Sequence, residues 1–164
     1  MAPSLPKSML LQVALFLVLS VFSARADPDP LADFTPSNQT SFVFRSLGTN
    51  GVVSVSAGGK RAGLSAHQCN LPSADGITYV RFEMAPCGVN EPHIHPRASE
   101  ILTLVSGGAL QVGFVDTKST PHIDLIYPGD VTIFPQGMMH FEINLGNTTA
   151  LYFSALNSEN PGTL

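Results

Sequence analysis

Eight strand-length runs of apolar and β-branched residues fill the chain from residue 52 onward, without a helical repeat. Turn residues separate them, as at Ser106-Gly107-Gly108 and Pro128-Gly129-Asp130. Runs this short and regularly spaced favour an antiparallel sandwich or barrel over a parallel α/β fold, so we expect an all-β domain. The predicted strands are Val52–Ala57, Ile77–Met84, Ile101–Val105, Leu110–Val115, Ile123–Tyr127, Val131–Phe134, His140–Leu145 and Leu151–Ala155.

One of these runs alternates polar and apolar residues. His140, Glu142 and Asn144 would lie on one face of a strand, with apolar side chains on the other. If the polar face lines a metal-binding cavity, the apolar face must be covered by a second sheet or by a neighbouring subunit.

The first 26 residues have the features of a secretory signal peptide. Lys7 precedes an apolar run of about 14 residues, and Ala24-Arg25-Ala26 fits the small-x-small cleavage pattern. A membrane anchor is the alternative, but this run is shorter than the about 20 residues that a span needs. We expect a mature chain that begins at Asp27 and is secreted to the extracellular space, cell wall or apoplast.

The sequence therefore predicts three parts: a signal peptide (1–26), an N-terminal arm (27–45) and one β-barrel domain (46–164). Residues 1–26 hold two of the eight basic residues and no acidic ones, so the mature chain has a net charge of −6. Nucleic acids and anionic membranes select Lys/Arg clusters, so we expect neither as a partner. About 138 residues suffice for one domain with one hydrophobic core.

Two cysteines lie in the predicted mature part. An oxidising compartment makes a Cys69–Cys87 disulfide the simplest expectation, with two buried free thiols as the alternative. Asn38-Gln39-Thr40 and Asn147-Thr148-Thr149 are glycosylation sequons, which are meaningful only in a secreted chain.

Three histidines and one glutamate form a candidate metal site. His93 and His95 are two residues apart, so on a strand both would project from the same face. Glu100 follows a proline-containing bend, and His140 would arrive from a distant strand. Three imidazoles and a carboxylate suit Mn, Fe, Cu, Ni or Zn better than Ca or Mg. Four protein ligands would leave two positions open on an ion that prefers six, as a catalytic site requires.

The candidate ligands belong to two longer patterns. These are His93-x-His95-x4-Glu100-x6-Gly107 and Gly129-x5-Pro135-x-Gly137-x2-His140-x3-Asn144. They are the two signature boxes of the cupin superfamily. The continuation Pro96-Arg97-Ala98-Ser99-Glu100 and the start Asp27-Pro28-Asp29-Pro30-Leu31-x-Asp33-Phe34 resemble germins, germin-like proteins and spherulins, and the resemblance runs along the whole chain.

The resemblance implies a single-domain cupin jelly-roll β-barrel with Mn(2+) held by His93, His95, Glu100 and His140, Fe or Cu being the alternatives. It also implies an extracellular glycoprotein that forms a homo-oligomer. Activities known in the family are superoxide dismutation and oxalate oxidation, and some members have no established activity.

The chain departs from the family pattern inside the first box. Cys87 stands where a glycine usually opens it, and the N-terminal cysteine pair of plant germins is absent. In the oxalate oxidases an asparagine directly precedes the arginine that matches Arg81, and here that residue is Val80. Its companion asparagine is present as Asn90. Loss of one substrate-orienting amide weakens the case for oxalate.

The C-terminus also departs from the pattern. Residues 154–162 resemble the third germin box, but the sequence stops at Leu164, where the family normally continues with a strand and helices used in subunit contacts. We therefore expect the C-terminal helical extension to be missing, in a shortened form or an incomplete gene model.

Several polar residues have a structural and a functional interpretation. Asn90 could orient a substrate or cap its turn, and Glu142 could act as a general base, a hydrogen-bond partner of the site or a solvated strand residue. These two are the candidate catalytic residues. We expect His67 and His122 as surface groups, Asn144 as structural and Arg97 in an ion pair. We expect Met138 and Met139 as cavity-lining or packing residues rather than copper ligands.

The leading hypothesis is a secreted, manganese-binding germin-like cupin with superoxide dismutase activity, a substrate that only the resemblance suggests. An oxalate oxidase is the first alternative. The second is a non-enzymatic extracellular or storage protein, in which the metal serves stability.

Overall fold

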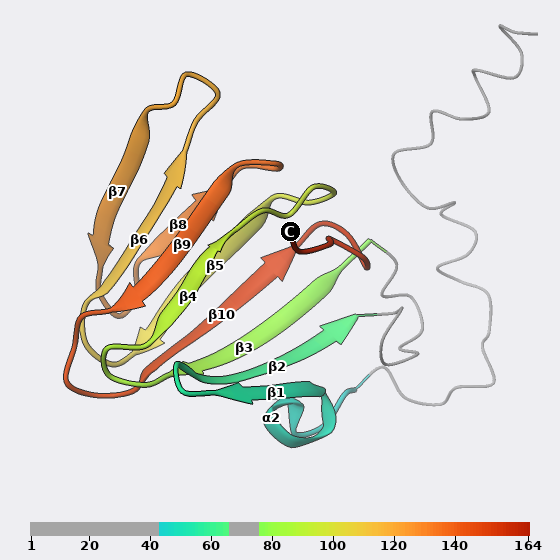
Figure 1. Cartoon of the computed structure of the whole chain (residues 1–164). Helices are drawn as coiled ribbons and strands as arrows, with labels where there is room; N and C mark the ends of the chain where they lie inside the picture. Colours follow the sequence, from blue (N-terminus) through green and yellow to red (C-terminus); the bar gives the residue numbers. More distant parts are fainter. Residues whose placement is uncertain (1–42, 66–75) are drawn as a thin grey trace, which may run out of the picture. The chain divides into compact units, whose positions relative to one another are not determined.

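The computed structural model describes residues 43–65 and 76–164. Ten strands and one short helix make up this part of the chain (Figure 1). They are α2 (Leu47–Asn50), β1 (Val52–Ser56), β2 (Gly59–Ser65), β3 (Thr78–Met84), β4 (Val89–His93), β5 (Glu100–Ser106), β6 (Leu110–Val115), β7 (Pro121–Ile126), β8 (Val131–Phe134), β9 (Met139–Asn144) and β10 (Ala150–Leu156).

The strands form two antiparallel sheets, shown as two layers in Figure 1. One has six strands in the order β1-β2-β3-β10-β5-β8, and the other has four in the order β4-β9-β6-β7. Neighbouring strands in each sheet come from distant parts of the sequence, since β10 lies between β3 and β5 and β9 lies between β4 and β6. This is the all-β jelly roll expected from the sequence.

The hydrophobic core lies between the two sheets. Alternate residues of β10 are buried, as a strand with one face on a core requires. The largest buried cluster joins residues of both sheets, and Phe82 and Phe114 pack against it. Its members are Met84, Leu102, Leu104, Leu110, Val112, Ile126, Phe134, Ala150 and Tyr152.

Two strands, β2 and β4, were not predicted from the sequence. β2 reads Gly-Lys-Arg-Ala-Gly-Leu-Ser and β4 reads Val-Asn-Glu-Pro-His, both poor in β-branched and aromatic residues. Pairing with stronger neighbours overrides this weak propensity, because β2 lies between β1 and β3. β4 is an edge strand, where a proline such as Pro92 is tolerated.

Glycine is required at the turn between β5 and β6. Gly107 has a φ of 109°, and a Cβ there would lie 2.5 Å from the carbonyl oxygen of Thr149. Only glycine adopts this conformation without strain and fits beside the neighbouring backbone. The turn predicted at Ser106-Gly107-Gly108 is therefore fixed by both torsion and space.

The outer face of the six-stranded sheet is apolar at one edge. Ile101 and Val105 on β5 and Val131 and Ile133 on β8 are all exposed. In the other sheet, the apolar side chains of β9 are opposite the buried polar ones, as the alternation predicted. The homo-oligomer expected from the sequence stays a prediction.

Cys87 is an exposed free cysteine, which differs from the predicted Cys69–Cys87 disulfide. Cys69 itself lies outside the described residues. The predicted signal peptide, most of the arm, His67 and the first sequon also lie outside them. Asn147 of the second sequon is exposed in the turn before β10. Among the described residues, no helix is long and apolar enough to cross a bilayer.

Candidate metal centre

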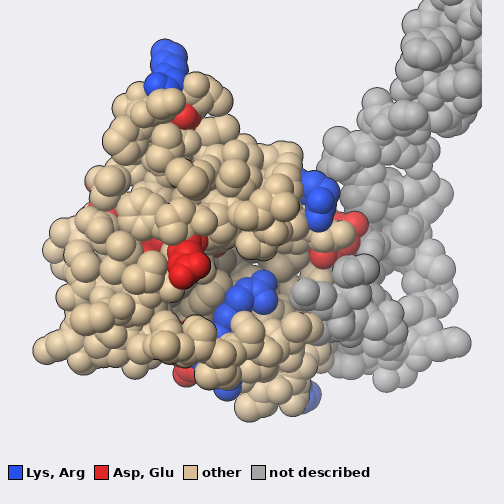
Figure 2. Space-filling model, viewed as in Figure 1, with Lys and Arg blue, Asp and Glu red and all other residues tan. Residues whose placement is uncertain are grey.

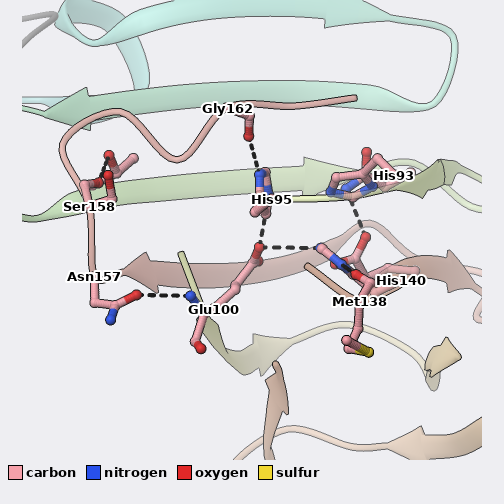
Figure 3. A network of polar contacts seen from close by, with 12 residues as sticks. His93, His95, Glu100, Met138, His140, Asn157, Ser158 and Gly162 are labelled. Carbon is pink, nitrogen blue, oxygen red and sulfur yellow. Dashed lines mark hydrogen bonds and ion pairs between the residues drawn. The ribbon is translucent and has the colours of Figure 1, made fainter. Parts of the chain in front are cut away.

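Four donor side chains converge at one end of the barrel (Figure 3). Glu100 begins β5, His140 lies on β9, and His93 ends β4. One ligand atom from each of these residues and from His95 lies within 4.8 Å of the others. His95 follows the end of β4, so the prediction that both histidines of the first box lie on one strand is wrong. The bend after His93 nevertheless keeps the two rings together, with centroids 5.0 Å apart.

Backbone carbonyl groups orient all three histidine rings. The acceptors are the carbonyl oxygens of Glu91, Gly162 and Met138, at 2.7, 2.5 and 2.9 Å from Nδ1 of His93, His95 and His140 respectively. A carbonyl oxygen can only accept, so each Nδ1 must carry the proton and donate it. In a neutral ring, Nε2 then keeps its lone pair for a metal, which is the arrangement typical of metal-binding histidines.

The carboxylate of Glu100 faces two of these Nε2 atoms. Its Oε2 lies 3.2 Å from Nε2 of His95 and 3.6 Å from Nε2 of His140. Nε2 of His140 is buried and has no hydrogen-bond partner among the described residues. A buried lone pair beside a carboxylate is unfavourable unless a proton or a cation lies between them. The donor set therefore suits a bound metal ion.

The pKa values of the cluster reflect the same charges. Burial would raise the pKa of Glu100, but the neighbouring His140, His95 and Ser154 side chains outweigh it and lower the pKa to about 2. Burial lowers the pKa of His93, and its histidine neighbours lower it further. Burial also acts to lower the pKa of His95, but the bonds to Glu100 and to the Gly162 carbonyl raise it overall. An ionised Glu100 and a neutral His93 are the protonation states that ligate metal.

The spacing of the four donors is close to what a single ion needs. Metal–nitrogen bonds of about 2.1 Å place two donors at most about 4.2 Å apart. The donor atoms here lie within 4.8 Å, so a small inward movement completes the site. Three imidazole nitrogens and one carboxylate oxygen are borderline donors that suit Mn, Fe, Cu, Ni or Zn.

Aromatic packing holds the His140 ring in place. The ring stacks on Phe134 of β8, with centroids 4.5 Å apart and an interplanar angle of 17°. The His93 ring also contacts the His140 ring, with centroids 4.2 Å apart. Since Phe134 belongs to the main hydrophobic cluster, the site rests directly on the core.

The sequence of this chain is similar to those of known proteins. Residues 46–164 match the family model described as Cupin. Over 182 residues, 96% of this chain and 81% of the relative, the chain is 34% identical to germin-like protein subfamily 1 member 13 of Arabidopsis thaliana. The chain is a germin-like cupin. It is also 49% identical to germin-like protein subfamily 1 member 7 of the same plant over 92 residues. This aligned stretch covers 54% of this chain and 40% of that protein.

A solved structure of oxalate oxidase has the same fold. It superposes on this germin-like cupin with a TM-score of 0.67 and 30% sequence identity, covering 79% of this chain and 67% of the other. The two chains thus share the barrel.

The two candidate catalytic residues contact each other beside the metal cluster. Nδ2 of Asn90 on β4 donates to Oε2 of Glu142 on β9 at 2.7 Å. Burial raises the pKa of Glu142 to about 8, and the negative charge of Glu100 adds to this effect. Glu142 is thus a buried carboxyl group in contact with a cavity-lining amide, which excludes the solvated interpretation.

The other polar residues weighed from the sequence lie in three environments. Asn144 donates to three carbonyl groups and is structural, as expected. Arg97 donates to the carbonyl and side-chain oxygens of Asn160, so it braces the C-terminal segment. It forms no ion pair with any residue in 43–65 or 76–164, unlike the prediction. His122 is exposed and pairs with Asp116 at 3.1 Å. Met139 is also exposed, at 44%, and does not line the cavity, so its prediction as a cavity-lining or packing residue is wrong.

A cavity of about 920 Å³ opens beside the cluster of this germin-like cupin. His93, His95, Glu100 and Asn90 line it, together with the C-terminal residues 159–164. Arg61 of β2 also lines it, and Figure 2 shows basic atoms within a hollow of the surface. Arg61 was not predicted as a site residue because β2 was not predicted as a strand. Alternation along β2 sets Arg61 opposite the apolar Ala62 and Leu64, so the sequence pattern alone gives no sign that its side chain faces inward.

Proposed function

We propose that this germin-like cupin binds one manganese ion through His93, His95, Glu100 and His140. The observation that carries the proposal is the orientation of the rings, since each Nδ1 is held by a backbone carbonyl and each Nε2 is left for the ion. Elemental analysis of the purified protein tests it, with one Mn per chain as the expected result. Fe or Cu in its place would change the metal but keep the site.

The arrangement of the four residues favours a catalytic over a closed structural site. His140 is buried, while His93, His95 and Glu100 line the open cavity. A bound manganese ion would supply a redox couple with positions open to a small molecule. The chain itself fixes the ring orientations, holds Glu100 ionised, and keeps a carboxyl group at Glu142 next to the cavity amide of Asn90.

Superoxide dismutation is the activity we propose first. Superoxide needs only a redox metal that it can reach, and the cavity gives access to the cluster. Metal-loaded protein should remove superoxide faster than the same concentration of free Mn. His140→Ala is the matched control, because it removes one ligand and should abolish the excess rate.

Oxalate oxidation is the second candidate, and the oxalate oxidase likeness favours it. A cavity of about 920 Å³ admits an organic acid, and Asn90 lies on its wall. Against it, Val80 places an apolar side chain on the same wall. An assay for hydrogen peroxide from oxalate, with the metal content measured on the same sample, separates the two activities. Full metal loading without either activity would favour a non-enzymatic extracellular or storage role.

We also propose that the mature protein is an extracellular, glycosylated homo-oligomer. The signal-peptide pattern, the exposed second sequon at Asn147 and the family membership support this. The exposed apolar edge at β5 and β8 offers a surface for self-association. Light scattering of the secreted protein, with and without glycosidase treatment, tests both properties.

A further inference from the structure

Strand register directs Arg61 into the barrel. On three adjacent strands, Arg61 pairs with Phe82 and Phe82 pairs with Tyr152. Directly paired residues project from the same face of a sheet. Tyr152 is fully buried in the core, so the whole row faces inward. Arg61 therefore extends from this inner face into the cavity that it lines.

The guanidinium group lies over an apolar wall. Its carbon is 5.9 Å from the centre of the Phe82 ring, at the outer limit of a cation–π contact. A Cβ at Gly63 would lie 3.1 Å from one of its terminal nitrogens, so the group lies over this glycine. Gly63 pairs with Val80, a buried cavity residue. Within the described part of the chain, the guanidinium makes no hydrogen bond or ion pair.

The charge of Arg61 is therefore directed at the cavity. It is the one Lys or Arg among the described residues that line the cavity. Three acids in the described part of the chain also line the cavity. Glu91 is exposed to solvent, Glu159 accepts a hydrogen bond from the Gly76 N–H, and Glu100 has its carboxylate against His95 and His140 and forms no ion pair with Arg61. Burial lowers the pKa of Arg61, partly offset by Glu100, and an arginine remains protonated despite such a shift. A half-buried cation with five N–H donors facing a cavity is a binding group for an anion.

We propose that Arg61 binds a carboxylate or another small oxyanion in the cavity, next to the four-residue cluster. The planar guanidinium presents paired N–H donors that match the two oxygens of a carboxylate. The apolar wall of Phe82 and Val80 lowers the local dielectric and so strengthens the contact. This role rests on the proposed function only in that the anion would share the cavity with the metal. It adds an anchor that the ligands and Asn90 do not supply.

Anion titration of the manganese-loaded protein tests the role without an activity assay. Oxalate and inorganic phosphate are titrated by calorimetry, which separates a carboxylate ligand from an inorganic one. Arg61→Gln should raise the Kd of the anion that binds by roughly 10- to 100-fold, the usual effect of losing a charge-assisted bidentate contact. Arg61→Lys keeps the charge but loses the paired donors, so its Kd should be intermediate.

Arg81→Gln is the matched control. Arg81 lies on the adjacent strand β3, outside the cavity lining, and pairs with Glu83 at 2.8 Å. It carries the same change of charge and should leave the Kd within about twofold. Gly63→Ala keeps every charge and pushes the guanidinium by a few tenths of an ångström. It should raise the Kd of the anion by a few-fold. A purely electrostatic or structural role of Arg61 would not produce this shift.

The outcomes separate this inference from the proposed function. Wild-type protein that takes up no manganese defeats the proposed function, and titration of the metal-free protein then tests Arg61 alone. Circular dichroism and manganese content are measured for each variant, so that only folded, equally loaded samples are compared. Equal Kd values for wild type and Arg61→Gln would overturn the role of Arg61. Wild-type protein that binds neither anion below about 10 mM would overturn it as well.

Discussion

The polar side chains at the two ends of the inner face of β9 are equally buried, but they differ in how many of their polar atoms are hydrogen-bonded. His140 is 1% exposed and Asn144 is 0% exposed, four residues further along the strand. The Asn144 amide donates to the carbonyl groups of Met84, Ala85 and Thr148, and its oxygen accepts from the Gly146 N–H. At His140, Nδ1 is bonded but Nε2 has no hydrogen-bond partner among the described residues. Asn144 therefore stabilises turns of the fold, whereas His140 keeps one nitrogen available to bind a metal ion.

The largest expected effect concerns the His140 end. His140→Ala removes a direct ligand, so manganese affinity should fall by more than the 10- to 100-fold typical of outer hydrogen-bond partners. Manganese uptake followed by electron paramagnetic resonance measures it. His122→Ala is the control, because His122 is exposed and pairs with Asp116. If both variants bind manganese like the wild type, the contrast between the two ends of β9 is not functional.

Asn144→Ala should have the opposite profile. It leaves three carbonyl groups and one N–H of the turns without their partner, so we expect a loss of about 3 kcal/mol in the free energy of unfolding. Urea denaturation of the metal-free protein measures it. Folded protein should still bind manganese. Asn147→Ala, in the exposed turn nearby, should be neutral, and a similar loss there would show that the amide network is not the cause.

Metal removal tests the same contrast without mutation. An ion present at 100 times its Kd stabilises the native state by about 2.7 kcal/mol, so a chelator should lower the melting temperature by roughly 10 °C. The shift should persist in Asn144→Ala and vanish in His140→Ala. Scanning calorimetry with and without chelator reads both. A chelator shift in His140→Ala would mean that the ion binds elsewhere.

The smallest expected effect concerns the support of the site by the C-terminal segment. Removing residues 161–164 deletes the Gly162 carbonyl that holds Nδ1 of His95, and also the backbone hydrogen bonds of Leu164 to Ile94 and of Pro161 to Arg97. Manganese affinity should therefore fall by roughly 10- to 100-fold. Arg97→Gln, which loses two bonds to Asn160 but keeps Gly162, should have a smaller effect. Manganese titration compares the two variants. Equal affinity of the truncated and full chains would show that this carbonyl is dispensable.

The sequence predicted much of this arrangement from local patterns. Alternation from His140 to Asn144 placed the buried polar face of β9, and turn residues marked most strand ends. The spacing of the two boxes predicted that the four candidate ligands come together. These features depend on neighbouring residues along the chain, so the sequence displays them directly.

The features that were missed depend on tertiary pairing. β2 forms because β1 and β3 flank it, which its glycine-rich composition does not indicate. Arg61 could therefore not be assigned to the cavity. The Asn90–Glu142 hydrogen bond joins β4 and β9, residues 52 positions apart, and the unpredicted β4 supplies one partner. Composition alone cannot show which side chain an edge strand will bring to its neighbour.

The stacking of His140 on Phe134 has a kinetic consequence. Its imidazole cannot swing outward without separating aromatic rings that belong to the folded interior. Release of the ion from His140 therefore requires local opening of the barrel, whereas the ligands that line the cavity can move without it. An ion held by this imidazole should therefore exchange more slowly than the cavity-side ligands alone would allow.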